Sequence, residues 1–412
     1  MASSGYLVSV GSKSSEGKTK AKRDLEEIIS KGVYATWLTE SKDGKWSSAM
    51  YGTLADYATI KPGDNIYFFA DRKIYGIGEV VDCFGEKQAA FALDNPLDDS
   101  YSKRLYSENS THRKIVKDDV VKVQRWGVVF KPAPFFFSEG VDMDDLLNSD
   151  PLAFRSLRVF WKRSFIQFDE KENAAFKSAL LRLNEAVLDS DSADGRLPAC
   201  LKIVNPKSGE WKSTPLSLKR LLSEDPNPCE TLVEAGLISA LIREEKSAME
   251  CFGKWDFVTR QIPASPFKPV DYMDRTDVFG WRFIPDVPEK PKYEPRFISK
   301  YLLVEIKNER ITNRKIKANI NQLMKYVEWV CQEYAHGDYS MIEAFLVAPD
   351  FSTAGKRYGK NLIKEIKESV TRNYVTGHEA NSHSWADIKL VAYSVDKESG
   401  EMKFEICCDL SK

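Results

Sequence analysis

Hydrophobic and polar positions along the chain predict a β-rich first half. Short apolar runs bounded by turn formers predict strands at residues 32–38, 65–70, 74–81 and 120–130. A Pro-Gly-Asp turn precedes the second of these runs, and a short polar turn joins it to the third, so residues 65–81 are expected to form a hairpin. The segment 154–168 then leads into an amphipathic pattern at residues 170–186, which predicts a helix.

The second half has a different pattern, in which helices and strands alternate. Helical spacing of apolar residues predicts helices at 229–245, 314–334 and 356–371. Strands are expected at 255–259, 275–283 and 342–348, with a final hairpin of 388–394 and 402–407 and a very apolar strand at 301–306. Helices around a buried strand are typical of a mixed α/β domain, that is, a mixed sheet flanked by helices.

The length of 412 residues exceeds what a single hydrophobic core supports, so two domains are expected. We place a β-rich domain with helices at residues 1–186, a connector at 187–223 and an α/β domain at 224–412. Hydrophobic residues at 42% and charged residues at 29% exclude wholesale disorder and collagen-like architecture.

Charge and composition narrow the classes of partner and cofactor. The net charge is −1, so a nucleic-acid partner would have to be held by a local basic surface. No long apolar run and no secretory leader are found, which predicts a cytoplasmic protein that does not bind membranes. The seven cysteines form no CxxC pair and the four histidines form no HExxH motif, so any metal would be held by carboxylates.

Chemistry concentrates in the second half, at Asp277 in RTDVFG and at Glu305 and Lys307 in LLVEIKN. Residues two apart in a strand point to the same face, so Glu305 and Lys307 emerge side by side while Ile306 turns into the core. If Asp277 lies on the paired strand, the two carboxylates form an oxygen pocket suited to Mg²⁺ or Mn²⁺. Lys307 would then position a water molecule or stabilise the transition state.

This Asp followed by ExK on a buried strand resembles the PD-(D/E)XK nucleases over residues 226–394. The resemblance implies that Asp277 and Glu305, with the main-chain carbonyl of Ile306, bind the metal ion and that Lys307 assists attack. A glutamate of the preceding helix completes the site in that family. Here it is Glu234, which we prefer to its rival Glu230 one turn earlier.

A QxxxY motif and an RxD motif resemble the branch of that family that contains RecB-like and mismatch-nuclease-like members. The resemblance implies that Gln322 and Tyr326 line the active site and contact DNA or the metal-bound water. Five basic residues are expected to contact DNA phosphates, and the alternative is that each is simply solvated: Arg275, Arg310, Arg314, Lys315 and Lys317. An ExK motif alone occurs by chance in most proteins of this length, so the combination carries the assignment.

In the first half, KPGDNIYFF followed by IYGIGEVV resembles the PUA-like superfamily, especially its EVE and YTH-like branch, over residues 32–183. The resemblance implies a barrel that binds a flipped modified base in an aromatic pocket. Trp37 and Trp46 are the candidates for the pocket, with Tyr34 and Tyr75 behind them. The alternative for each aromatic residue is core packing.

Together the two resemblances predict a modification-dependent restriction endonuclease that defends its host, uses Mg²⁺ or Mn²⁺ and cuts double-stranded DNA near a modified base. One such site cuts one strand, so a homodimer is expected, at least on DNA. The alternatives are a mismatch- or structure-directed repair nuclease and a non-catalytic nucleic-acid-binding protein. The chain contains no GxxxxGK[ST] motif, so any nucleotide dependence would come from a separate partner.

Overall fold

A computed structural model describes residues 3–10, 17–41, 48–83, 85, 87, 89–93, 115–117, 120–150, 153–154, 165–190, 193–200, 213–216, 218–219, 222, 228–265, 274–285, 297–353, 355–375 and 383–412. The chain forms two compact units, Met1–Ser217 and Leu218–Lys412. The boundary lies within the segment 187–223 that the sequence assigns to a connector. Trp46, a candidate for the aromatic pocket, lies outside the described residues.

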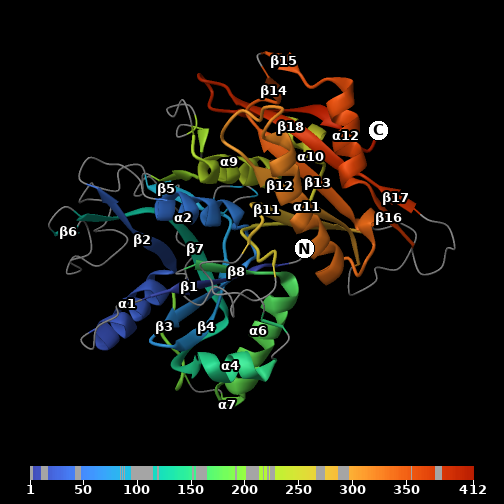
Figure 1. Cartoon of the computed structure of the whole chain (residues 1–412). Coiled ribbons are helices and arrows are strands. Elements are labelled where there is room, and N and C mark those ends of the chain that lie inside the picture. Colours follow the sequence, from blue (N-terminus) through green and yellow to red (C-terminus); the bar gives the residue numbers. More distant parts are fainter. Residues whose placement is uncertain are drawn as a thin grey trace. The chain divides into compact units, whose positions relative to one another are not determined.

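The first unit is built on one nine-stranded sheet (Figure 1). Its strands are β1 (Gly5–Ser9), β2 (Val33–Ser41), β3 (Asn65–Ala70), β4 (Lys73–Val80), β5 (Phe91–Leu93), β6 (Ile115–Lys117), β7 (Val120–Asp142), β8 (Phe165–Phe168) and β9 (Ser213–Pro215). Its helices are α1 (Gly17–Lys31), α2 (Ser48–Thr59), α4 (Met143–Ser149), α6 (Glu170–Leu183) and α7 (Glu185–Leu188).

The long strand β7 gives this sheet its curl. Its first part pairs with β2 and its second part with β4, and both pairings contain register shifts. Shifts of this kind bend a strand and increase its twist, so the sheet closes partway toward a barrel. Aromatic side chains fill the interior, and the Tyr67 and Phe68 rings of β3 pack against Phe176 and Phe130 respectively. The expectation of a β-rich unit with helices is therefore confirmed.

Several elements of the first unit match the sequence pattern and others do not. The hairpin of β3 and β4 and the helix α6 are confirmed. Strand β7 continues twelve residues beyond the predicted end at 130, because its second partner β4 supplies hydrogen bonds there. Strand β1 and helices α1 and α2 were not predicted, although Ala21, Leu25, Ile28 and Ile29 of α1 are buried at helical spacing.

The second unit is a mixed α/β unit around a six-stranded sheet (Figure 1). Its sheet has the strand order β10 (Phe257–Arg260), β11 (Val278–Phe283), β12 (Ile298–Ile306), β13 (Ile342–Ala348), β18 (Ile388–Val395) and β19 (Met402–Asp409). Two short ribbons are formed by β14 (Ser352–Thr353) with β15 (Lys356–Arg357) and by β16 (Arg372–Tyr374) with β17 (His383–Trp385). The helices are α9 (Glu230–Ile242), α10 (Lys246–Phe252), α11 (Ile316–Glu333), α12 (Lys360–Val370) and the 3-10 turn η2 (Tyr339–Met341).

The centre of this sheet is parallel and its edges are antiparallel. Strand β13 runs parallel to both β12 and β18, whereas β10–β11, β11–β12 and β18–β19 are antiparallel pairs. Helix α11 makes the crossover from β12 to β13, as a parallel pair requires. Helix α9 is buried almost all round, and a side chain at Gly236 would meet the sulfur of Met402. The mixed α/β class expected for this half is confirmed.

Candidate active site

The pairing of β11 with β12 brings Asp277 next to Glu305. Val278 pairs with Val304 in an antiparallel register, so the residue before Val278, Asp277, comes opposite the residue after Val304, Glu305. The main-chain N–H of Ile306 donates a 2.7 Å hydrogen bond to Oδ2 of Asp277. Asp277 therefore lies directly before β11, the partner strand of the ExK, and its carboxylate is bonded to the backbone of the ExK strand.

Glu305 and Lys307 leave the end of β12 on the same face, as the alternation of a strand predicts. Nζ of Lys307 lies 2.6 Å from Oε1 of Glu305, and Ile306 between them is fully buried. Glu305 is only 1% exposed, and its second oxygen, Oε2, is buried without a hydrogen-bond partner. A buried carboxylate oxygen without a partner is costly, so this atom marks a position where a ligand would be favourable.

Burial and mutual repulsion perturb the charges of this group. Burial raises the pKa of Asp277 to about 7, the charge of Glu305 adds to this effect, and the Ile306 N–H and Lys307 oppose it. The pKa of Glu305 is raised by burial, against the influence of Lys307. Burial lowers the pKa of Lys307, but the nearby carboxylates more than compensate, and its pKa is raised. When both carboxyl groups are ionised, two carboxylates and one ammonium carry an excess of negative charge, and a bound cation would neutralise it and favour those ionised forms.

The preferred helix glutamate, Glu234, is engaged elsewhere. Its two carboxylate oxygens accept hydrogen bonds of 2.8 and 3.1 Å from Nε and Nη2 of Arg260 on β10, and both side chains are buried. The exposed rival Glu230, in the first turn of α9, is the helix carboxylate whose charge acts on Asp277, Glu305 and Lys307 alike. The charge of Glu234 also acts on Glu305, but Glu234 is bound to Arg260, so we prefer Glu230 as the helix carboxylate of the site.

Gln322 and Tyr326 lie one turn apart on α11 and contact each other. Nε2 of Gln322 donates a 3.0 Å hydrogen bond to the hydroxyl of Tyr326. Burial raises the pKa of Tyr326 to about 12, and the charges of Glu305 and Asp277 act in the same direction. The Tyr326 hydroxyl thus lies within the electrostatic influence of both carboxylates.

Gln261, which follows β10 directly, is a residue of the site that no sequence motif indicates. Its side-chain amide donates a 3.4 Å hydrogen bond to Oδ1 of Asp277, and its main-chain N–H donates to the carbonyl of the same residue at 3.2 Å. Arg260 was missed as well. Neither residue belongs to a motif, and both contacts depend on strand pairing, so no sequence signal would have identified them.

Most of the basic residues expected to contact DNA form ion pairs. Arg310 pairs with Asp350 at 2.8 Å, Lys315 with Glu309 at 2.6 Å and Lys317 with Glu365 at 2.9 Å, all at exposed positions. Arg314 is exposed and makes no ion pair with the described residues, and Arg275 is half-buried and forms a backbone bridge with Pro263. Arg314 is therefore the basic residue of this set most available to a phosphate.

The aromatic candidates of the first unit have separate environments. Tyr34 is buried against Phe68, and burial raises its pKa to about 12, whereas Tyr75 is buried and packs near Gly140. Trp37 is half-buried beside an irregularity of β2, where the register with β7 shifts between Ala35 and Trp37. The structure thus supports core packing for the two tyrosines, and Trp37 alone of the described candidates retains partial exposure.

The irregularity in β2 also creates a polar group that the sequence did not predict. At Thr36 the main-chain N–H donates to the hydroxyl of Tyr57 at 3.1 Å, and the threonine hydroxyl lies 2.9 Å from the same oxygen. The Tyr57 ring packs near Trp126. Irregularities of this kind often redirect side chains next to functional sites.

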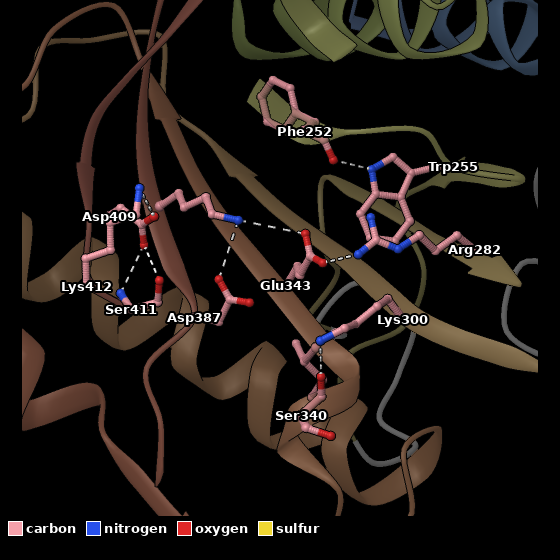
Figure 2. Close-up of polar contacts among 12 residues, drawn as sticks. Phe252, Trp255, Arg282, Lys300, Ser340, Glu343, Asp387, Asp409, Ser411 and Lys412 are labelled. Carbon is pink, nitrogen blue, oxygen red and sulfur yellow. Dashed lines mark hydrogen bonds and ion pairs between the residues drawn. The ribbon is translucent and has the colours of Figure 1, made fainter. Parts of the chain in front are cut away.

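A second group of charged residues (Figure 2) lies on the face of the second unit's sheet that is opposite to the face of Glu305. Arg282 binds Glu343, and Nζ of Lys389 lies 3.8 Å from Glu343 and 3.5 Å from Asp387. The guanidinium of Arg282 also lies over the Trp255 ring, 4.8 Å from its centroid. These charges pair with one another, so the group links three strands.

Among the described residues, no group of three or more His, Cys, Asp or Glu side chains is arranged to hold a metal ion. The donors present are the two carboxylates of Asp277 and Glu305. None of the described helices is both long and apolar enough to cross a lipid bilayer.

Comparisons with known proteins give little further information. No family model matches the chain, and no curated protein matches it. A solved structure described as a hypothetical protein from Leishmania major is similar over 45% of this chain and 97% of that chain, with 16% sequence identity and a TM-score of 0.24. At this TM-score the likeness assigns neither fold nor function.

Proposed function

We propose that the chain is a metal-dependent DNA endonuclease with a PD-(D/E)XK site in its second unit. The observation that carries this proposal is the pair of carboxylates, half-buried Asp277 and buried Glu305, at the ends of adjacent strands with the Lys307 ammonium bound to Glu305. A like-charge pair with shifted pKa values is typical of functional sites.

The residues present fit a hard divalent cation. Both charged donors are carboxylates, and Oε2 of Glu305 is buried without a hydrogen-bond partner. Asp277 and Glu305, with the Ile306 carbonyl, would hold Mg²⁺ or Mn²⁺, and Glu230 is the nearby carboxylate that could add to them. When bound, the metal supplies positive charge that polarises a phosphodiester and lowers the pKa of a water molecule.

The remaining chemistry belongs to side chains of the chain itself. Lys307 stays protonated because its pKa is raised, so its ammonium can orient the attacking water and stabilise charge on the phosphate oxygens. The Tyr326 hydroxyl, held by Gln322, can donate a hydrogen bond to the same phosphate. Arg314 can bind a neighbouring phosphate of the DNA backbone.

For the first unit we propose recognition of a modified base in double-stranded DNA, in which Trp37 supplies a stacking face. The partial exposure of Trp37 and the polar group of Thr36 and Tyr57 beside it support this role. A splayed base can stack on an indole and be read along its edge by hydroxyl groups. Joined to the nuclease site, this function is that of a modification-dependent restriction enzyme, which would act as a dimer on DNA to cut both strands.

The test is cleavage of matched plasmids that are unmodified, adenine-methylated, cytosine-methylated or glucosylated at hydroxymethylcytosine, in Mg²⁺ and in Mn²⁺. Lys307→Ala is the inactive variant, and Lys300→Ala, which removes a lysine from the other end of the same strand, is the matched control. Cutting confined to one modified plasmid, lost in Lys307→Ala and kept in Lys300→Ala, supports the proposal. Equal cutting of all plasmids would indicate a repair nuclease, and no cutting in either metal would indicate a binding protein.

A further inference from the structure

Gln261 has a backbone conformation that side chains rarely adopt. Its φ is 54°, in the left-handed region, directly after the last residue of β10. Glycine adopts this conformation without steric cost, whereas glutamine is not among the residues enriched there. Such residues persist only where surrounding contacts hold them, and they cluster at functional sites.

Two hydrogen bonds join Gln261 to Asp277. The main-chain N–H of Gln261 donates to the carbonyl of Asp277 at 3.2 Å, and its amide Nε2 donates to Oδ1 at 3.4 Å. The other carboxylate oxygen, Oδ2, accepts the 2.7 Å bond from the N–H of Ile306. Each oxygen of this carboxylate is therefore held by the chain of a neighbouring strand.

Strand register explains how one residue reaches Asp277 twice. Arg260 pairs with Val278 in the antiparallel register of β10 and β11, so the next residue, Gln261, comes opposite Asp277. Opposite residues of an antiparallel pair direct their side chains to the same face of the sheet. The main-chain N–H and the side-chain amide of Gln261 can therefore both contact Asp277.

The amide also differs in charge from the other donor side chain of the site. Lys307 contacts Glu305 as a cation and so cancels part of its charge. Gln261 orients Asp277 with a neutral donor, which leaves the negative charge of that carboxylate available to a cation. Partners of this kind, which orient a metal ligand without binding the metal, commonly set its affinity.

We propose that Gln261 is a positioning residue that holds Asp277 beside Glu305 and thereby sets the affinity of the site for a divalent cation. This inference rests on the proposed function, since it concerns the same metal site. No sequence motif identifies Gln261.

The test measures Mn²⁺ binding to the full chain without DNA, from the electron paramagnetic resonance signal of unbound Mn²⁺. Gln261→Met keeps the length of the side chain and removes the donor, and Gln261→Gly removes the donor and relaxes the backbone. We expect both variants to bind Mn²⁺ about tenfold more weakly than the wild-type chain. The thermal midpoint of Gln261→Gly should be no lower than that of Gln261→Met, because glycine adopts the left-handed backbone without strain. In cleavage, excess Mn²⁺ should restore turnover, because the ligands themselves remain.

Two reference variants separate the possible outcomes. Glu305→Gln removes a ligand and should abolish binding, whereas His336→Gly relaxes another left-handed residue, φ 51°, at an exposed position after α11 and should leave binding unchanged. Wild-type affinity in both Gln261 variants, with binding lost in Glu305→Gln, overturns the positioning role and leaves the nuclease proposal intact. If Gln261→Met binds Mn²⁺ weakly while Gln261→Gly binds it with wild-type affinity, the shape of the methionine side chain causes the effect. That result also overturns the positioning role. Absence of Mn²⁺ binding by the wild-type chain overturns the proposed function and this inference with it.

Discussion

Replacing Glu234 by glutamine should destabilise the second unit rather than switch off its chemistry. The Glu234 and Arg260 side chains are 3% and 9% exposed and form a two-pronged ion pair between α9 and β10. Glutamine preserves the shape of the side chain but removes its charge. The guanidinium of Arg260 then loses the charge of Glu234, and removing one partner is the costly way to break a buried pair.

The expected loss in the free energy of unfolding is roughly 3–5 kcal/mol. For a unit of this size, 1 kcal/mol corresponds to a shift of about 2–4 °C in the thermal midpoint, so the second unit should unfold roughly 6–20 °C earlier. The double variant Glu234→Leu with Arg260→Met removes both charges and replaces them with apolar groups of similar volume. It should recover most of the loss, because both charges of this pair are removed together.

The assay is urea and thermal unfolding of the full chain, alongside plasmid cleavage at a temperature where every variant is folded. Glu230→Gln is the matched control, since its exposed position predicts a change in stability within about 0.5 kcal/mol. We expect Glu230→Gln to weaken cleavage and the double variant to retain it. Wild-type stability of Glu234→Gln combined with loss of cleavage would refute this reasoning and return Glu234 to the active site.

Three other predictions concern separate parts of the chain. Burial raises the pKa of Asp64 to about 7, so between pH 4 and 7 the folded first unit holds a proton that the unfolded chain has lost. The free energy of unfolding should therefore fall with rising pH, by up to about 1.4 kcal/mol per pH unit. Urea unfolding of Asp64→Asn across this pH range should lack this contribution to the pH dependence. Gly280→Ala should lower the thermal midpoint of the second unit, because the added Cβ would lie 2.4 Å from the carbonyl oxygen of Phe257 in the adjacent strand. Arg314→Ala should weaken DNA binding and reduce the salt dependence of log Kd by about one unit, whereas Lys317→Ala, which removes a lysine paired with an acid, should change this slope less.

The regular elements of the second unit were largely predictable because their patterns are local. The predicted strand 342–348 matches β13, and the predicted helix 314–334 contains α11. Residues at helical or strand spacing bury one face wherever the element is placed, so this pattern survives without knowledge of the fold. The strand alternation that places Glu305 and Lys307 on one face is local in the same way.

Other features depend on partners far away in the sequence. The end of β7 at Asp142 is set by its pairing with β4, and the predicted end at 130 missed this pairing. The choice between Glu230 and Glu234 depends on Arg260, which is separated from Glu234 by 26 positions. The helix α1 was missed for a different reason, since its buried residues do show helical spacing but lie in a stretch that otherwise reads as polar.

The sequence by itself determined the class of the second unit, its central strand and the residue types of the candidate site, because spacing along one strand decides which side chains share a face. Only the tertiary structure decided that Asp277 lies beside Glu305, that Oε2 of Glu305 has no protein partner, and that Gln261 contacts Asp277. The physical reason is that strand register and burial are collective properties of the packed sheet. A contact between residues far apart in the chain exists only after both strands have paired.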